Sequence, residues 1–169
     1  MSTGDASYAS ALDGRVSGAG LRVALVAARF HPGVTEQLLE SARNCLTEHG
    51  VTPEAIEVVR VPGAWELPQA VGWLTERRRH DAIVALGCLI RGQTAHFDLI
   101  AAEVARGLGD LARASGIPIL FGVLTTEDEA QAMERADPVR GNKGREVALA
   151  ALEMAALRAR GEPRPPGLR

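Results

Sequence analysis

Short apolar runs alternate with longer segments of helical pattern along most of this chain. The runs are rich in Val, Ile and Leu and predict strands, whereas the segments between them predict amphipathic helices. Strands that are joined through helices pair in parallel, with right-handed crossovers. The expected strands are Leu21–Ala27, Ile56–Val61, Ala82–Ile90 and Ile117–Leu124. We therefore predict an α/β fold, a three-layer sandwich of the flavodoxin-like kind, with a four-stranded parallel sheet and helices on both faces.

Glycine and proline mark several ends of the helices that we expect between and after these strands. Pro32 suits a first helical position, and Gly50 and Gly116 suit helix stops. The residues Thr126-Glu127-Asp128-Glu129 form a capping-box pattern that opens a short helix. The other expected helices cover residues 32–50, 66–79, 97–115 and 145–160.

Length and composition indicate one globular domain. A chain of 169 residues buries one sizeable core, and we expect it over residues 21–160, between a flexible arm at 1–20 and a disordered, proline-rich tail at 161–169. The net charge of −2 predicts neither a nucleic-acid nor a membrane partner. Cys45 and Cys88 show no metal-ligand or redox spacing, so we expect reduced thiols in a cytoplasmic protein, with no bound metal.

A ligand site is expected where the parallel strands end, because such sheets bind ligands beyond their carboxyl edge. The richest segment there follows the third strand. In it, Gly92-Gln93-Thr94 precedes a long helix, whose free N–H groups favour an anion such as phosphate. His96 lies at the same helix start and either exchanges protons beside that anion or caps the helix. No GKS or GKT follows, so a nucleoside triphosphate is disfavoured.

Other candidate residues have a structural alternative as well. Phe30, at a strand end, either stacks on a planar heterocycle or belongs to the core. Glu66 either accepts hydrogen bonds from a ligand or satisfies its helix start, and Arg135 either clamps phosphate or favours the helix dipole. Lys143 faces either solvent or a ligand. Trp73 is expected in the core, and the run Arg77–His80 is expected to be solvated.

Taken together, these segments resemble the lumazine synthase family from Leu21 to Met154. The motif GCLIRGQTAHFD carries most of the resemblance, and ARF, PGAWELP, FGVLTTE and GNKG occur in the right order around it. Each motif is weak alone, but five in sequence at the expected strand ends are specific.

The resemblance implies a role for each candidate. Phe30 would stack on the pyrimidine of 5-amino-6-(D-ribitylamino)uracil, and His96 would be the proton donor and acceptor. Phe121 would close the pocket from an adjacent subunit. The remaining implied contacts are the ribityl chain for Ala64, Trp65 and Glu66, the uracil edge for Cys88, Leu89 and Ile90, and the phosphate of 3,4-dihydroxy-2-butanone 4-phosphate for Gln93, Thr94 and Arg135.

The implied reaction is a condensation to 6,7-dimethyl-8-ribityllumazine in riboflavin biosynthesis, with no cofactor and no metal. The family also implies a homo-pentamer. The short loop between the last two helices resembles that of relatives that pack twelve pentamers into a 60-subunit shell, and riboflavin synthase is then a candidate partner. His31 stands where relatives often have Asn, and we expect this difference to affect capping more than the pocket.

Three other functions are compatible with this fold. The chain could bind a flavin or lumazine without turnover, or form a container for another enzyme. The presence of His96 and Arg135 favours catalysis over pure binding, and only the long N-terminal arm points to a container. A flavodoxin-like electron carrier would need a hydroxyl-rich phosphate loop after the first strand, where this chain has ARFHPG.

Overall fold

A computed structural model describes residues 16–161, so the predicted arm and tail lie almost entirely outside the described part. Four parallel strands form one sheet in the order β2-β1-β3-β4, as the alternating pattern predicted. The strands are β1 (Val23–Ala28), β2 (Ile56–Val61), β3 (Ala82–Ile90) and β4 (Ile119–Thr126).

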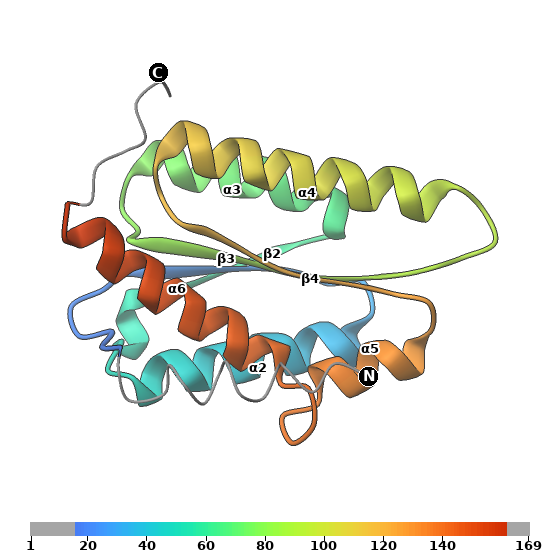
Figure 1. Cartoon of the computed structure of the whole chain (residues 1–169), viewed down its shortest axis with the longest axis horizontal. Coiled ribbons are helices and arrows are strands. Elements are labelled where there is room, and N and C mark those ends of the chain that lie inside the picture. Colours follow the sequence, from blue (N-terminus) through green and yellow to red (C-terminus); the bar gives the residue numbers. More distant parts are fainter. Residues whose placement is uncertain (1–15, 162–169) are drawn as a thin grey trace.

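Helices cover both faces of this sheet and make the predicted three-layer sandwich (Figure 1). One face is covered by α3 (Leu67–Arg77) and α4 (His96–Ser115). The other is covered by α2 (Pro32–Glu48), α5 (Glu129–Ala136) and α6 (Lys143–Ala159). Short 3₁₀ turns at Pro53–Ala55 and Ala64–Glu66 precede β2 and α3. Within residues 16–161 no helix is long and apolar enough to cross a bilayer.

Strand β1 is buried on both faces, as a central strand between two helical layers must be. Its alternate side chains belong to two separate apolar clusters, with Leu25 facing the α2–α5–α6 layer and Val26 facing the α3–α4 layer. The outer strand β2 is buried only at its two ends. The centre of the sheet is therefore fully packed between the two helical layers, and the carboxyl ends of its strands are held by this packing.

Several local predictions were wrong. Strand β4 begins at Ile119, because Pro118 has no N–H for the ladder and only its carbonyl pairs, accepting from Ile83 N. Asp128, not Thr126, caps α5, and its carboxylate accepts from Gln131 N at 2.8 Å. Trp73 is 56% exposed on the outer side of α3 and is not a core residue.

The prediction that the run Arg77–His80, at the end of α3, is solvated was only partly correct. Arg77, Arg78 and Arg79 are exposed, but His80 is buried and its Nε2 lies 2.9 Å from the Glu57 carboxylate. Arg78 adopts the left-handed conformation that ends α3, two residues before the buried His80.

Candidate active site

The carboxyl ends of all four strands meet at one edge of the sheet, on the right in Figure 1. Next to this edge lies a hollow of about 300 Å³, which we call the first hollow. It is lined by segments that follow β1, β2 and β3, as the position rule for parallel sheets predicts. The lining residues are Phe30, His31, Gly63, Ala64, Trp65, Cys88, Leu89, Ile90, Gly92, Thr94, His96, Phe97 and Ile100.

Phe30 stands at the wall of the first hollow and is not a core residue, since 67% of its surface is exposed. Its backbone N–H donates to Pro62 O at 3.2 Å, which ties the end of β1 to the end of β2. The His31 ring meets the phenyl edge-on, with centroids 5.0 Å apart and an interplanar angle of 89°. An exposed phenyl held in this way offers a flat face to a planar ligand.

His31 lines the first hollow, contrary to our expectation that the change from Asn would hardly affect the pocket. Its backbone is left-handed, with φ 56° and ψ 61°, and its side chain makes no capping hydrogen bond to α2. Asn, Asp and His adopt this conformation more often than other non-glycine residues, so His31 is compatible with the turn that begins α2.

Glu66 serves its own turn in this structure. Its carboxylate accepts from Gly63 N at 2.9 Å, which closes the turn Pro62–Glu66 before α3. Ala64 is buried beneath the turn, and Trp65 is 57% exposed beside the hollow. The Glu66 side chain does not line the hollow, so a ligand contact would require it to share or leave the Gly63 N–H.

The end of β3 forms an apolar floor. The Cys88 side chain is almost fully buried there, and burial, followed by the charge of Glu129, raises the pKa of its thiol to about 11. Leu89 and Ile90 are half-buried beside it. Cys88 is therefore a neutral thiol near pH 7, suited to packing and not to nucleophilic attack.

His96 is the first residue of α4 and lies at the mouth of the first hollow. Thr94 lines the same hollow, and its hydroxyl accepts weakly from His96 N at 3.4 Å. Within the described chain no side chain caps the helix at Ala95, so the first backbone N–H groups of α4 are available to an anion. Gln93 is exposed and does not line the hollow.

Phe121 and Arg135 lie elsewhere, in a second hollow of about 370 Å³ along β4. Arg135 is in the last turn of α5, as predicted, and Phe121 is 46% exposed on the strand. Lys143 lines the same hollow, and its ammonium lies 2.8 Å from the Glu146 carboxylate. The second hollow is lined by residues 120–125, 135, 143, 146, 147 and 150.

The GNKG motif shapes the second hollow from its backbone. A Cβ on Gly141 would lie 2.6 Å from Arg135 Cα, and one on Gly144 would lie 2.4 Å from Leu38 O in α2. Between them, Asn142 is left-handed and caps α6 by accepting from Arg145 N at 3.3 Å. The motif is therefore a packing requirement that brings Arg135 and Lys143 to one place.

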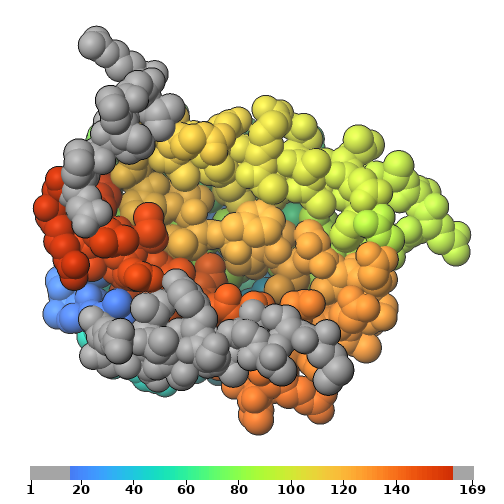
Figure 2. All heavy atoms as spheres, viewed as in Figure 1, coloured from blue at the N-terminus to red at the C-terminus, as the bar shows by residue number. Residues whose placement is uncertain are grey.

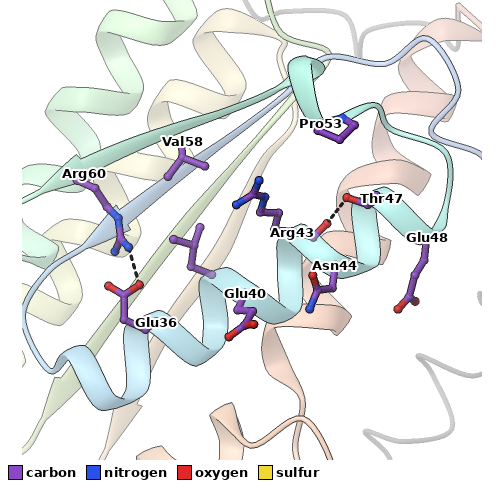
Figure 3. A pocket seen from close by; sticks show the side chains of 10 residues that line it. Glu36, Glu40, Arg43, Asn44, Thr47, Glu48, Pro53, Val58 and Arg60 are labelled. Carbon is purple, nitrogen blue, oxygen red and sulfur yellow. Dashed lines mark hydrogen bonds and ion pairs between the residues drawn. The ribbon is translucent and has the colours of Figure 1, made fainter.

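A larger hollow, of about 810 Å³, lies between α2 and β2, and its lining includes none of the predicted site residues (Figure 3). Arg60 spans it to Glu36, with 2.5 Å between the guanidinium and the carboxylate, and this hydrogen bond lowers the pKa of Glu36. Its other charged side chains are Glu40, Arg43 and Glu48. The first hollow, and not this one, is lined by aromatic rings and by two histidines, His31 and His96.

The structure thus brings together most, but not all, of the predicted site residues. Those in the first hollow are Phe30, Ala64, Trp65, Cys88, Leu89, Ile90, Thr94 and His96, and those in the second are Phe121, Arg135 and Lys143. Glu66 and Gln93 line neither. His31, Phe97 and Ile100 line the first hollow without having been predicted there. Phe97 and Ile100 follow His96 by one and four residues on the same helix, and this spacing could have indicated that they lie near it.

Known proteins with similar sequences were found over most of the chain. A family model described as 6,7-dimethyl-8-ribityllumazine synthase matches residues 20–159. A 6,7-dimethyl-8-ribityllumazine synthase of Aquifex aeolicus is 48% identical over 145 residues, which cover 86% of this chain and 94% of the relative. Relatives of the same name from Thermococcus gammatolerans and Thermococcus kodakarensis are 47% and 46% identical over 146 residues, covering 86% of this chain and 93% and 92% of theirs.

Proposed function

The chain belongs to the 6,7-dimethyl-8-ribityllumazine synthase family, and from this membership we infer that it is the enzyme of riboflavin biosynthesis that forms this lumazine. Its substrates are 5-amino-6-(D-ribitylamino)uracil and 3,4-dihydroxy-2-butanone 4-phosphate, and it releases phosphate and water. It binds small molecules and assembles as an oligomer, in keeping with the family.

We propose that the first hollow binds the pyrimidine substrate. The exposed face of Phe30 supports this, because a planar ring that stacks there meets the apolar floor formed by Cys88, Leu89 and Ile90. Ala64 and Trp65 border the space beside it, where the ribityl chain would extend. Glu66 remains a candidate for the ribityl hydroxyls only if its carboxylate accepts from them in addition to Gly63 N.

His96 is the proposed proton-transfer residue, and its position in the first hollow at the start of α4 is the observation that carries this proposal. The 5-amino group attacks the ketone, and the imine that forms requires proton transfers beside it. Phosphate then leaves, and the ribitylamino nitrogen closes the ring. Thr94, the free N–H groups of α4 and, less directly, Gln93 would receive the phosphate.

Each complete site is proposed to combine the first hollow of one subunit with the second hollow of a neighbour. Arg135 and Phe121 line the same hollow, so both would come from the neighbour, with Lys143 as a further cation. Arg135 would stabilise the leaving phosphate through its planar guanidinium. This division of the site between neighbouring subunits supports the pentamer expected from the family, in which every subunit contacts the next one around the ring.

The higher assembly and the location in the cell are further proposals. We propose a pentamer, with twelve pentamers packed into a 60-subunit shell, because the connection between α5 and α6 is short. Riboflavin synthase is the proposed cargo of such a shell. The two cysteines, Cys45 and Cys88, are buried thiols and not a disulfide, which supports the cytoplasmic location.

Absorbance-monitored lumazine formation from the two substrates tests the function, with His96→Ala run beside the wild type. We expect wild-type turnover and a loss of about 10²- to 10⁴-fold in kcat for the variant, the usual contribution of a general acid–base group. Size-exclusion chromatography should show equal assembly of both proteins. A folded and assembled wild type without turnover would favour the flavin-binding or container function, and flavin titration would then distinguish those two.

A further inference from the structure

The loop between β3 and α4, residues 91–95, and the first helical residue, His96, are exposed at every position, although Thr94 and His96 line the first hollow. Figure 2 shows the yellow-green segment that includes it standing out from the body of the molecule. A Cβ added at Gly92 would find no atom within 4 Å, so the loop has open space around it. Its own hydrogen bond from His96 N to Thr94 is long, at 3.4 Å. Local packing therefore does little to fix the position of His96.

Arg91 connects this loop to two other elements. Its Nη1 donates to the Asp98 carboxylate in the first turn of α4, at 3.0 Å. Its Nε lies 3.1 and 3.0 Å from the two carboxylate oxygens of Glu127, just after β4. The guanidinium carbon also lies 4.3 Å from the centre of the Phe97 ring, and the Arg91 backbone N–H donates to Thr126 O at 2.9 Å.

These contacts suit arginine in particular. The planar guanidinium presents donors in fixed directions, so one side chain reaches two carboxylates while its face covers an aromatic ring. Lysine offers one point charge and cannot do all three at once. The hydrogen bonds to Asp98 and then Glu127 raise the pKa of Arg91, so the group stays charged throughout the working range of an enzyme.

We propose that Arg91 is a positioning residue for the reaction: with Asp98, Glu127 and Phe97 it forms a clip that fixes His96 and the start of α4 relative to the ends of β3 and β4. Of its four residues only Phe97 lines the first hollow, so Arg91, Asp98 and Glu127 act from outside it. This inference rests on the proposed role of His96, and it adds a residue outside the first hollow on which that role depends.

The expected consequence is large for catalysis and small for stability. Exposed ion pairs contribute little to the free energy of unfolding, and the side chains of Asp98 and Glu127 are both more than half exposed. A misplacement of a proton-transfer group by about 1 Å, however, costs about 100-fold in rate. Loss of the clip should therefore leave the fold intact and slow the chemistry.

The test compares Arg91→Gln and Arg91→Lys with the wild type by hydrogen–deuterium exchange and by kinetics. We expect Arg91→Gln to speed exchange of the amides of residues 99–102, where the hydrogen-bonded part of α4 begins with Leu99 N donating to Ala95 O, by about 10-fold, with no change in the second half of α4. We expect kcat to fall by about 10- to 100-fold while KM for the pyrimidine changes little. Arg91→Lys should rescue only part of either effect.

Arg106→Gln is the matched control, because Arg106 also pairs with acidic side chains on α4, Glu103 and Asp110, but far from the loop. It should change neither the exchange of the amides of residues 99–102 nor kcat. Unchanged exchange in Arg91→Gln would overturn the clip, and faster exchange with wild-type kcat would overturn its role in positioning His96. The exchange measurement needs no turnover, so an inactive wild type would count against the proposed function alone.

The two carboxylates give a second, independent test, which also serves if Arg91→Gln does not assemble. Asp98→Asn and Glu127→Gln should each lower kcat by about 3- to 10-fold, as expected for loss of one of two coupled contacts. Combining either with Arg91→Gln should cost no more than Arg91→Gln alone, because the shared contact is already lost. Additive losses would show that the three residues act separately and would overturn the clip.

Discussion

The two hollows that hold the predicted site residues are built from different parts of the fold and offer different side chains. The first lies over the ends of β1, β2 and β3 and offers a flat ring, an apolar floor and a histidine at a helix start. The second lies along the outer strand β4 and offers Arg135, Lys143 and the ring of Phe121. In the proposed reaction, proton transfer uses the first set of side chains and phosphate loss uses the second, and within one chain the two sets lie in separate hollows.

This separation explains why a synthase of this kind would depend on its oligomer. Strand β4 is at one end of the sheet order, so its outer side is free to meet another subunit. Over residues 16–161, the first hollow has no arginine or lysine among its lining residues, and the second has no histidine. The following predictions test the division, from the largest expected effect to the smallest.

Subunit mixing tests the division most directly. Co-assembly of His96→Ala and Arg135→Ala subunits in equal amounts should restore about a quarter of wild-type turnover, because about one site in four then combines an intact first hollow with an intact second hollow. Each variant alone should be far less active. Turnover no higher than the mean of the two parents would show that both residues act from one chain.

Arg135→Ala should act on the sugar phosphate. We expect its apparent KM to rise by about 10- to 100-fold, as charge-assisted hydrogen bonds to phosphate are worth about 1.5–3 kcal/mol. Steady-state kinetics with each substrate varied in turn provides the measurement, and Arg140→Ala, on the nearby loop, is the control. An effect confined to the pyrimidine would assign Arg135 to a different part of the site.

Phe30→Ala should act on the other substrate. Loss of the stacking face should weaken pyrimidine binding by about 1–3 kcal/mol, by analogy with base–aromatic stacking, and Phe30→Tyr should keep most of the affinity. Equilibrium titration with the pyrimidine alone isolates this effect from the chemistry. Unchanged affinity in Phe30→Ala would mean that the exposed phenyl has another use.

The smallest effect is expected at the floor of the first hollow. Since burial raises the pKa of Cys88 to about 11, its thiolate should be scarce at pH 8 and alkylation should be slow, by about 100-fold relative to a free thiol. A Cys45→Ala background restricts the measurement to one thiol. Cys88→Ala should retain turnover within about 3-fold, since a neutral buried thiol contributes packing alone. Rapid alkylation at pH 8 would contradict an apolar floor.

The sequence predicted the strands well where apolar pattern and burial agree. Ile56–Val61 and Ala82–Ile90 have the predicted bounds. Trp73 was misplaced because helical periodicity does not say how far a layer extends, and the outer side of α3 faces away from the sheet. His80 was misplaced because the left-handed turn at Arg78 is not encoded in the charge pattern.

The position rule for parallel sheets located the first hollow correctly, since it depends only on strand direction. The rule could not predict that Phe121 and Arg135 lie in a different hollow from Phe30 and His96, because their placement depends on the order of strands in the sheet. Nor could it show that Glu66 hydrogen-bonds to Gly63, since one carboxylate suits a turn and a ligand equally well in sequence. The family resemblance supplied the roles, which remain predictions.

The central position of β1 also has a consequence for how the chain is made. Its residues are buried on both faces, yet its neighbour β3 begins only at Ala82, after α2, β2 and α3 have been synthesised. At about 5–20 residues per second, β1 waits several seconds for that partner during translation. A fully apolar strand in an unfinished chain is prone to aggregate. We therefore expect the yield of soluble protein to rise when translation is slowed or chaperones are abundant.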